Sequence, residues 1–521
     1  MNWPWLVPVV LGLLGVVLLL YYTRFGAWVS GDAVHYIAGA RSLMAGDIYG
    51  YPAADGVRPI VAFPPLLSTV LAGIGLFGID PLPGSRYLNS VLFGVNIALT
   101  WLITFRFSGS KVTAALIAAW FLLSQIILAV HGAAMSEALF IFLTLVSIYA
   151  LGRFVIEDDV VWLVFGGIAA GLSIITRFAG LALVAASVAA LILFWDRGLR
   201  EKLRAAALYV VPALLPFAYW SFRNSGLSDT ATGRPVEWLL TRTRLALSLG
   251  EASTWLFGDV GTRRVQILLM AALVALAFAV AAYLTLRIYR DRRLTEGARW
   301  FPTFLLTFIL GYLAMMIASM AFLDATLRIT QRYLSPVLAV AMILTGLLAG
   351  WRLARPGTPI GLGRVITGAF VALLALNGWK TIQIAIEPPP RGYADARYSS
   401  GTIERLLEID PEITIITNDR EYVYILTGRS AYSVPLGRDQ FTQALREDLP
   451  GQMAAYRDRL ANGAVLALFD DYWVRDFTPS GGTLIEGLEI YADAEDGALY
   501  VDPNAWRDSQ GGDDASIYSR G

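Results

Sequence analysis

Long apolar stretches recur along this chain and constrain its fold more than any other feature. A helix rises 1.5 Å per residue, so about 20 apolar residues cross a hydrocarbon core of ~30 Å. The first stretch, Pro4–Tyr22, lacks the Lys/Arg-rich start and the small-residue cleavage site of a signal peptide, so we expect an uncleaved first span. Ten more stretches follow at 87–105, 112–130, 137–152, 160–176, 179–195, 205–222, 265–286, 301–323, 333–350 and 365–385. The sequence therefore predicts an α-helical polytopic membrane protein with about eleven transmembrane helices.

Composition agrees with a membrane protein and excludes several kinds of site. Of the 521 residues 56% are hydrophobic and only 16% are charged, well below the usual share of charge in soluble proteins. Lys and Arg number 41, as do Asp and Glu, so net charge gives no reason to expect a nucleic-acid partner. The chain has no cysteine, which excludes disulfides, thiolate metal sites and cysteine nucleophiles.

The charges between the apolar stretches predict the orientation of the chain. Segment 60–79 is apolar but carries Pro64 and Pro65, so it can either span or lie against the membrane. If it does not span, the four short basic loops all fall on the side of the N-terminus, as the positive-inside rule requires for the cytoplasm. These loops are Arg106–Lys111, Asp196–Arg204, Arg287–Arg299 and Arg352–Arg364.

If segment 60–79 does not span, the polar segments are divided between the two sides of the plasma membrane as follows. Residues 24–85 become one long first external loop with juxtamembrane helices, and the N-terminus lies in the cytoplasm. The other external segments are 131–136, a turn near Arg177, 223–264, 324–332 and everything after about residue 386.

Two acidic residues on the external side are candidates for acid–base chemistry. Asp32 begins an amphipathic helix in the first loop, where Tyr36, Ala40 and Leu43 share one face. Glu137 opens the stretch 137–152 at the membrane edge, where carboxylates are rare and often functional. One acid can accept the proton of an attacking hydroxyl while the other orients that acceptor. A helix cap for Asp32 and a favourable helix-dipole interaction for Glu137 are the structural alternatives.

External arginines are candidates for binding a phosphate. Arg177 lies between two apolar stretches, and Arg332 opens the stretch 333–350. A planar guanidinium in apolar surroundings needs an anionic partner and suits phosphate oxygens. Snorkelling to the lipid headgroups is the alternative for both residues. Arg58 and Arg223 are weaker candidates of the same kind.

Other kinds of catalytic site have no support in the sequence. His35 and His131 are the only histidines and lie far apart, so we expect no metal site. No Walker loop, GxSxG elbow or HExxH motif occurs, and no cofactor is expected.

Five separated motifs resemble the GT-C superfamily of polytopic glycosyltransferases, in particular its protein-mannosyltransferase and aminoarabinose-transferase branch. DAVHYIAGARSLMAGDIY resembles the acidic motif of the first loop, although Ala33 stands where the family often has Glu. AFPPLLS at 62–68 resembles the PPL segment, and MSEALFIFL at 135–143 resembles the start of the fourth span. TRFAGLAL at 176–183 and QRYLSPVLA at 331–339 are similar to two later motifs. The resemblance covers residues 1–385 as architecture.

The resemblance implies a function and a place for each candidate residue. Asp32 takes the position of the catalytic acid and Glu137 that of the second acid. Arg177, Arg332 and Arg58 are expected to bind the donor's phosphate, and His35, Tyr36 and Tyr333 to contact the acceptor or the sugar. The donor would be a polyprenyl-phosphate sugar, the acceptor a hydroxyl of a glycan, lipid or protein, and the transfer inverting. The partners are thus a lipid-linked donor, an acceptor and membrane lipids.

A separate domain is predicted after the proline run Pro388–Pro390. ITIITN at 413–418 reads as a strand, REYVYILTG at 420–428 as a helix, and AYSVP, AVLALFD and LEIYADAEDGALYVD continue the pattern. We therefore expect a transmembrane domain over 1–387, an external α/β domain over 388–505 and a disordered tail over 506–521.

Two other classes of function stay open at this point. A lipid or glycan transporter, or flippase, would be expected to show two halves with matching broken helices, and the sequence shows no such symmetry. A non-catalytic subunit of glycan assembly would keep the scaffold without the acids, whereas both Asp32 and Glu137 are present.

Overall fold

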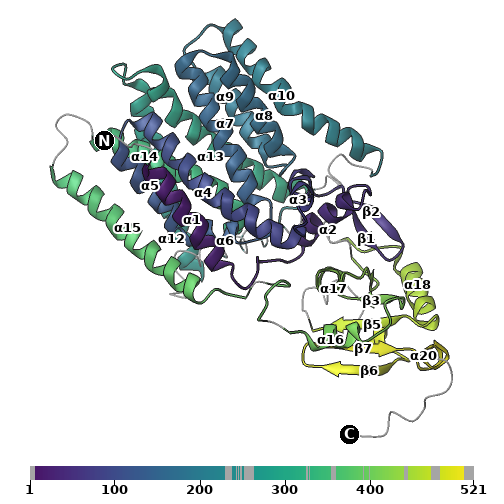
Figure 1. Cartoon of the computed structure of the whole chain (residues 1–521). Coiled ribbons are helices and arrows are strands. Elements are labelled where there is room, and N and C mark those ends of the chain that lie inside the picture. The colour runs from purple at the N-terminus through teal and green to yellow at the C-terminus, as the bar shows by residue number, and fades with distance from the viewer. Residues whose placement is uncertain are drawn as a thin grey trace. The chain divides into compact units, whose positions relative to one another are not determined.

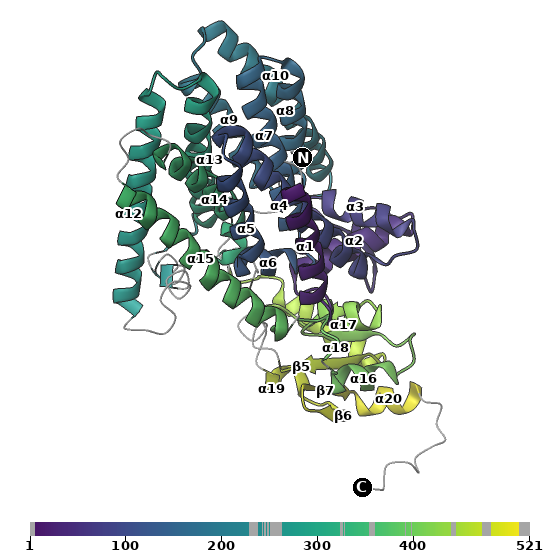
Figure 2. The same cartoon turned by 60° about the vertical axis from the view of Figure 1, so that its left-hand side comes forward.

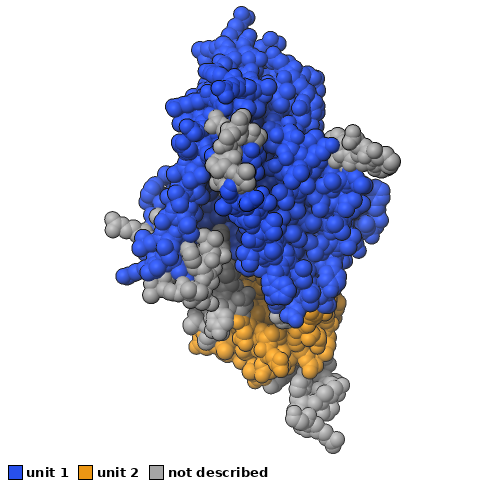
Figure 3. Space-filling model, turned by 90° about the vertical axis from the view of Figure 1, so that its left-hand side faces the viewer, with its two compact units in different colours: residues 1–27, 61–390 blue, residues 28–60, 391–521 orange. Residues whose placement is uncertain are grey.

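The chain forms two compact units in a computed structural model. The structure describes residues 6–228, 238–241, 243, 246, 249–250, 263–323, 327, 329–353, 360–390, 392–397, 399–438, 444–470 and 481–509. Unit 1 comprises Met1–Ala27 and Val61–Pro390, and unit 2 comprises Trp28–Ile60 and Arg391–Gly521 (Figure 3). Most of the predicted external loop 223–264, and residues 354–359 of the basic loop Arg352–Arg364, fall outside the described residues.

Unit 1 is a bundle of helices (Figure 1). Each of the eleven predicted stretches is helical. The helices are α1 (Leu6–Tyr22), α4 (Pro81–Ser108), α5 (Lys111–Leu123), α6 (Gln125–His131), α7 (Glu137–Glu157), α8 (Val160–Ile174), α9 (Gly180–Phe194), α10 (Leu199–Ser225), α12 (Arg263–Arg290), α13 (Glu296–Phe322), α14 (Gln331–Leu353) and α15 (Ile360–Ile386). The stretch 112–130 is broken at Ser124, where α5 and α6 meet at a bend of 59°.

Among the described residues, seven of these helices are long and apolar enough to cross a membrane, and α5 with α6 makes an eighth candidate. The remaining three, α1, α8 and α9, are apolar but have only 15 to 17 residues. Only 6% of the apolar stretch of α12 and 11% of that of α15 are buried. Both helices lie at the periphery of the bundle, as Figure 2 shows. Such exposed apolar surface requires lipid around it, so the fold is that of a polytopic membrane protein, while eleven spans stay a prediction.

The bundle core combines close backbone contacts with large aromatic side chains. α1 and α4 approach so closely that a Cβ added to Gly94 would lie 2.6 Å from the carbonyl oxygen of Gly12, so only glycine fits there. Trp101, Phe140 and Phe304 are fully buried among the helices. Because lipid is as apolar as a leucine side chain, close packing rather than hydrophobic exclusion holds such helices together.

The ambiguous segment 60–79 forms a short helix, α3 (Leu66–Gly75). Its ten residues rise about 15 Å, half of the hydrocarbon core, so α3 alone is too short to span. Pro64 and Pro65 precede the helix, in agreement with proline's preference for helix starts.

Unit 2 combines part of the predicted first loop with the C-terminal α/β domain. The loop contributes α2 (Asp32–Met44) and a hairpin of β1 (Gly50–Ala53) and β2 (Gly56–Pro59). The C-terminal residues form α16 (Gly401–Leu407), β3 (Ile415–Thr417), α17 (Arg420–Thr427), β4 (Tyr432–Ser433), α18 (Leu449–Ala461), β5 (Val465–Phe469), α19 (Gly481–Ile485), β6 (Glu489–Ala494), β7 (Gly497–Val501) and α20 (Pro503–Ser509). The helix α20 reaches into the predicted tail 506–521, and residues 510–521 lie outside the described part of the chain.

The C-terminal strands form one mixed sheet in the order β4-β3-β5-β7-β6. β3 pairs in parallel with β4 and β5, whereas β7 pairs antiparallel with β5 and β6. The buried side chains of β3, β5 and β7, among them Ile415, Val465 and Leu499, pack with Val423 of α17 in one core. The α/β fold expected after residue 388 is therefore present.

Candidate functional site

Three charged side chains from distant parts of the chain meet at one end of unit 1. Glu137 is the first residue of α7, Arg177 lies in the turn between α8 and α9, and Arg332 is the second residue of α14. Nη1 of Arg177 lies 2.5 Å from Oε1 of Glu137, and Nε of Arg332 donates to the same oxygen. The Glu137 side chain is 1% exposed, that of Arg177 12% and that of Arg332 24%. We call these three residues the ion triad.

Local hydrogen bonds at the start of α7 and in the turn between α8 and α9 orient the side chains of the ion triad. Ser136 occupies the cap position of α7, yet its hydroxyl makes no cap hydrogen bond and accepts instead from Nη1 of Arg177 at 3.2 Å. The backbone N–H of Arg177 donates to Ser173 and its carbonyl accepts from Gly180, which closes a tight turn between α8 and α9. This turn points Arg177 at the start of α7.

In the ion triad two guanidinium groups converge on one oxygen of a single buried carboxylate. A buried charge is costly unless it is paired, so this carboxylate depends on its arginine partners. Oε2 of Glu137 is buried and has no hydrogen-bond partner in the part of the chain that the structure describes. The ring of Tyr333 lies 5.5 Å from the guanidinium carbon of Arg177 and 5.3 Å from that of Arg332. Two converging guanidinium groups have the geometry that suits an anion such as phosphate, and Oε2 can accept a hydrogen bond from a hydroxyl.

Two asparagines that sequence analysis missed hold the backbone on either side of Glu137. Nδ2 of Asn89 donates to the carbonyl of Ala133 at 2.6 Å, and Nδ2 of Asn96 donates to that of Ala138 at 3.2 Å. Asn96 also donates to Nε2 of His131 at 3.0 Å, whose Nδ1 donates to the carbonyl of Ile127 at 2.8 Å. The sequence feature that could have identified them is the pair of asparagines, seven residues apart, within the apolar stretch 87–105.

Asp32 opens α2 in unit 2. The cap position is Gly31, with φ at 35°, so Asp32 is the first helical residue and its charge is favourable at the helix start. His35 lies one turn later, and its Nδ1 donates to the carbonyl of Gly31 at 3.3 Å. Burial lowers the pKa of His35, against the opposing charges of Glu421 and Asp32, so its imidazole is neutral at pH 7. Tyr36, the other predicted contact on this helix, is buried.

Arg58 forms an ion pair within the hairpin of unit 2. Its Nη2 lies 2.6 Å from Oδ2 of Asp55, and its Nε donates to Oδ1 at 3.2 Å. The hydrogen bonds from Arg58 hold the pKa of Asp55 below its usual value. A phosphate would have to compete with Asp55 for this arginine.

The structure thus places the predicted site residues in two groups. Glu137, Arg177, Arg332 and Tyr333 lie together in unit 1, where Glu137 pairs directly with both arginines. Asp32, His35, Tyr36 and Arg58 belong to unit 2.

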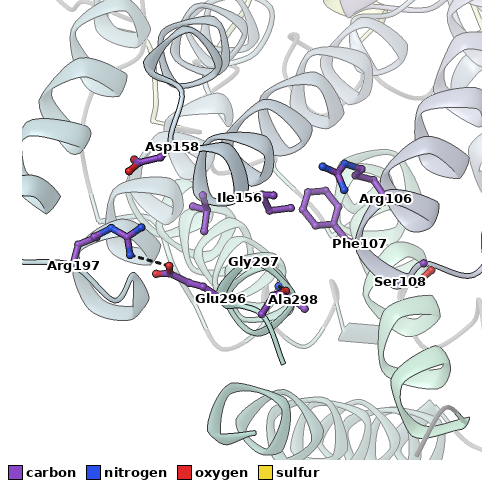
Figure 4. A pocket seen from close by; sticks show the side chains of 12 residues that line it. Arg106, Phe107, Ser108, Ile156, Asp158, Arg197, Glu296, Gly297 and Ala298 are labelled. Atoms are coloured by element: carbon purple, nitrogen blue, oxygen red, sulfur yellow. Dashed lines mark hydrogen bonds and ion pairs between the residues drawn. The ribbon is translucent and has the colours of Figure 1, made fainter. Parts of the chain in front are cut away.

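A pocket of about 530 Å³ lies beside the C-terminal end of α7, and charged and apolar side chains line it together (Figure 4). Arg106, Asp158, Arg197 and Glu296 line it, so three of the four predicted basic loops meet there. Nη1 of Arg197 lies 2.9 Å from Oε2 of Glu296. Because α7 runs for 21 residues from Glu137 to Glu157, roughly 30 Å separates this pocket from the ion triad.

Comparisons with known proteins agree with this architecture. Residues 54–225 match the family model described as dolichyl-phosphate-mannose-protein mannosyltransferase. A search among curated proteins gave no match. Among solved structures, ArnT from Cupriavidus metallidurans bound to undecaprenyl phosphate matches with a TM-score of 0.59 and 14% identity over 95% of this chain and 97% of that chain.

Two further structures have similar folds. The archaeal oligosaccharyltransferase AglB from Archaeoglobus fulgidus, in complex with an inhibitory peptide and a dolichol-phosphate, matches with a TM-score of 0.55 and 13% identity over 89% of this chain and 69% of that chain. The arabinofuranosyltransferase AftD from Mycobacteria, in its mutant R1389S, matches with a TM-score of 0.55 and 14% identity over 95% of this chain but only 41% of that chain. At these identities the likeness establishes the fold.

Proposed function

We propose that this chain, a membrane glycosyltransferase of the GT-C superfamily, transfers a sugar from a polyprenyl-phosphate donor to an acceptor hydroxyl on the extracytoplasmic side, with inversion. The observation that carries the proposal is the ion triad, in which two arginines from different helix ends converge on one oxygen of the buried Glu137 carboxylate. The undecaprenyl phosphate in the ArnT structure and the dolichol-phosphate in the AglB structure support a lipid-phosphate ligand here as well. The transporter alternative is not favoured, because the family model and the three structural matches are all transferases.

Arg177 and Arg332 would bind the phosphate of the donor. Guanidinium groups match phosphate oxygens, and in a site with little water their charge stabilises the negative charge that grows on a leaving phosphate. Glu137 holds both guanidinium groups through one oxygen, and this pairing supports a role for Glu137 in orienting them. Its unpartnered Oε2 gives it a second possible role, in which it accepts a hydrogen bond from the acceptor or the sugar.

Asp32 would act as the general base. It takes the proton of the acceptor hydroxyl while that oxygen forms its bond to the anomeric carbon. The bond from the anomeric carbon to the phosphate oxygen breaks, and its electron pair leaves with the lipid phosphate. Attack opposite to the leaving group inverts the anomeric centre. The neutral imidazole of His35 one turn after Asp32, together with Tyr36 and Tyr333, would contact the sugar or the acceptor, which is a glycan, a lipid or a protein.

The same proposal orients the chain in the plasma membrane, with a cytoplasmic N-terminus and an extracytoplasmic C-terminal domain. Native cysteine is absent, so single cysteines report orientation cleanly. We expect Gly451→Cys on α18, where a side chain meets open space, to react with an impermeant thiol reagent from outside. Arg290→Cys at the end of α12 should react only after the cells are opened. The reverse pattern would invert the topology.

Replacement of Asp32 tests the mechanism. Asp32→Asn keeps the size of the side chain and removes the proton acceptor, so we expect normal insertion and donor binding but turnover at least about a hundredfold slower. The assay is transfer of labelled sugar from a polyprenyl-phosphate donor by purified protein in nanodiscs. Asp47→Asn, an exposed acid of the same loop, is the matched control and should retain activity. Turnover near wild type by Asp32→Asn would remove Asp32 from the mechanism.

A further inference from the structure

The loop that carries Asp32 is fixed to the C-terminal domain just before α2. Val29 forms a parallel β-bridge with Gly392, and the N–H of Tyr393 donates to the carbonyl of Val29 at 2.9 Å. Gly392 has φ at +63°, and a Cβ there would lie only 2.1 Å from the carbonyl oxygen of Val29. Only glycine therefore permits this approach. We call the contact of Val29 with Gly392 and Tyr393 the backbone clamp; it lies three residues before Asp32.

A second contact holds the loop after α2. Tyr51 of β1 is buried, its ring lies 5.5 Å from that of Tyr424 on α17, and its hydroxyl donates to the carbonyl of Arg420 at 3.3 Å. The guanidinium carbon of Arg420 lies 5.3 Å from the centre of the Tyr51 ring. The centre of the His35 ring lies 5.3 Å from that of the Tyr51 ring. We call the contact of Tyr51 with Arg420 and Tyr424 the aromatic clamp.

The two clamps are joined within the C-terminal domain. Asp419 caps α17, because its Oδ1 accepts from the N–H of Tyr422 at 2.9 Å. Its Oδ2 accepts from the hydroxyl of Tyr393 at 2.7 Å, and Tyr393 belongs to the backbone clamp. Val423 on the same helix is fully buried in the core of the sheet. Both clamps are thus anchored to one rigid element, so α2 is held at its beginning and beyond its end.

We infer that the C-terminal domain positions the proposed base Asp32 through these two clamps. This inference rests on the proposed function of Asp32. A reacting group has to be held within about 0.5 Å of its productive position, and a misplacement of about 1 Å can cost roughly a hundredfold in rate. Residues Trp28–Ile60 belong to the same compact unit as Arg391–Gly521, so contacts with the C-terminal residues contribute to the position of α2. Gly392, Tyr51 and Tyr424 are accordingly positioning residues, which act on the reaction through Asp32.

Three variants in the intact protein test the inference. Gly392→Ala disrupts the backbone clamp, Tyr51→Ala removes the aromatic clamp, and Tyr51→Phe retains the ring but loses the hydrogen bond to Arg420. Gly451→Ala is the matched control, because it adds the same methyl group in the same domain where nothing lies within 4 Å. Hydrogen exchange of the α2 amides measures positioning without any need for an acceptor. Binding of a polyprenyl-phosphate donor and labelled sugar transfer are measured on the same samples.

We expect α2 amides to exchange at least about tenfold faster in Gly392→Ala and Tyr51→Ala, because local opening becomes easier. Turnover should fall at least about tenfold while donor affinity stays within about twofold, and Tyr51→Phe should recover most of both losses. Unchanged α2 exchange in both variants would overturn the inference. Faster exchange of the β5 and β7 amides in Gly392→Ala would show that this variant perturbs the C-terminal sheet itself. In that case the result for Tyr51→Ala tests the inference, because this variant leaves the C-terminal sequence intact. Faster α2 exchange together with an active Asp32→Asn would instead refute the role of Asp32.

Discussion

The helix α7 ends in a glutamate at both extremities, and each glutamate is paired with two arginines in very different surroundings. Glu137 at the start contacts Arg177 and Arg332 and is 1% exposed. Glu157 at the end contacts Arg153 and Arg106 and is 30% exposed. The sequence composition of the two clusters is the same, so their difference lies in burial and in hydrogen bonding.

Hydrogen bonding satisfies the exposed cluster completely and leaves the buried one incomplete. Arg153 donates to both oxygens of Glu157, and Nε1 of Trp162 donates to Oε2 at 3.0 Å. In the ion triad both arginines share Oε1 of Glu137, and its Oε2 has no partner among the described residues. A surface ion pair contributes at most about 1 kcal/mol, whereas breaking a buried ion pair costs several kcal/mol. The two clusters thus differ in burial and in the use of the second carboxylate oxygen, and this difference supports the proposed role of the ion triad in binding a ligand.

The largest expected effect comes from Glu137→Gln. This change removes the buried carboxylate that both guanidinium groups share, and breaking a buried ion pair should destabilise the protein by about 3–5 kcal/mol and abolish most transfer. Thermal unfolding in nanodiscs and labelled sugar transfer measure the two effects. Glu157→Gln at the other end of α7 is the matched control. Equal losses in both variants would show that burial does not distinguish the clusters.

Removal of one arginine of the triad should weaken donor binding. Arg177→Ala or Arg332→Ala removes one guanidinium group and the charge-assisted contact that it is proposed to make with the donor, worth about 1.5–3 kcal/mol or roughly a 10- to 150-fold change in affinity. Titration with a polyprenyl-phosphate sugar measures this loss. Arg106→Ala in the exposed cluster should bind the donor as the wild type does. Wild-type affinity in both triad variants would exclude a phosphate-binding role for these arginines.

The smallest effect is expected in the exposed cluster itself. Glu157→Gln should change the free energy of unfolding by no more than about 1 kcal/mol, because water and salt already screen these charges. The difference from wild type should shrink further when the salt concentration is raised. A loss of more than about 3 kcal/mol would show that this cluster, too, is energetically buried.

Much of the fold could be predicted from the sequence, because the type of each helix or strand follows largely from the residues within it. The apolar stretch from residue 137 predicted α7, whose first residue is Glu137, and ITIITN and REYVYILTG predicted β3 and α17. The bend at Ser124 was not predicted, since the hydropathy of 112–130 is continuous across it. Hydropathy measures composition along the chain and carries little information about a local change of direction.

The contacts within the ion triad depend on tertiary packing and were only partly foreseeable. Charge in apolar surroundings singled out Glu137, Arg177 and Arg332 one by one. Their pairing joins residues 40 and 195 positions apart, and it follows from which helix ends lie together in the bundle. The two clamps of unit 2 could not be predicted from the sequence, because no pattern distinguishes Val29, Tyr51 and Gly392 from ordinary loop residues.

The backbone clamp also has a consequence for the order of events during synthesis. Val29 and Gly392 lie about 360 residues apart, so at roughly 5–20 residues per second the loop waits roughly 20–70 s before its partner is made. During that interval the spans can insert while α2 still lacks both of its anchors. A nascent or truncated chain would therefore be membrane-bound but without a positioned base. On the proposed function and the inferred positioning of Asp32, sugar transfer would begin only after the C-terminal domain is complete.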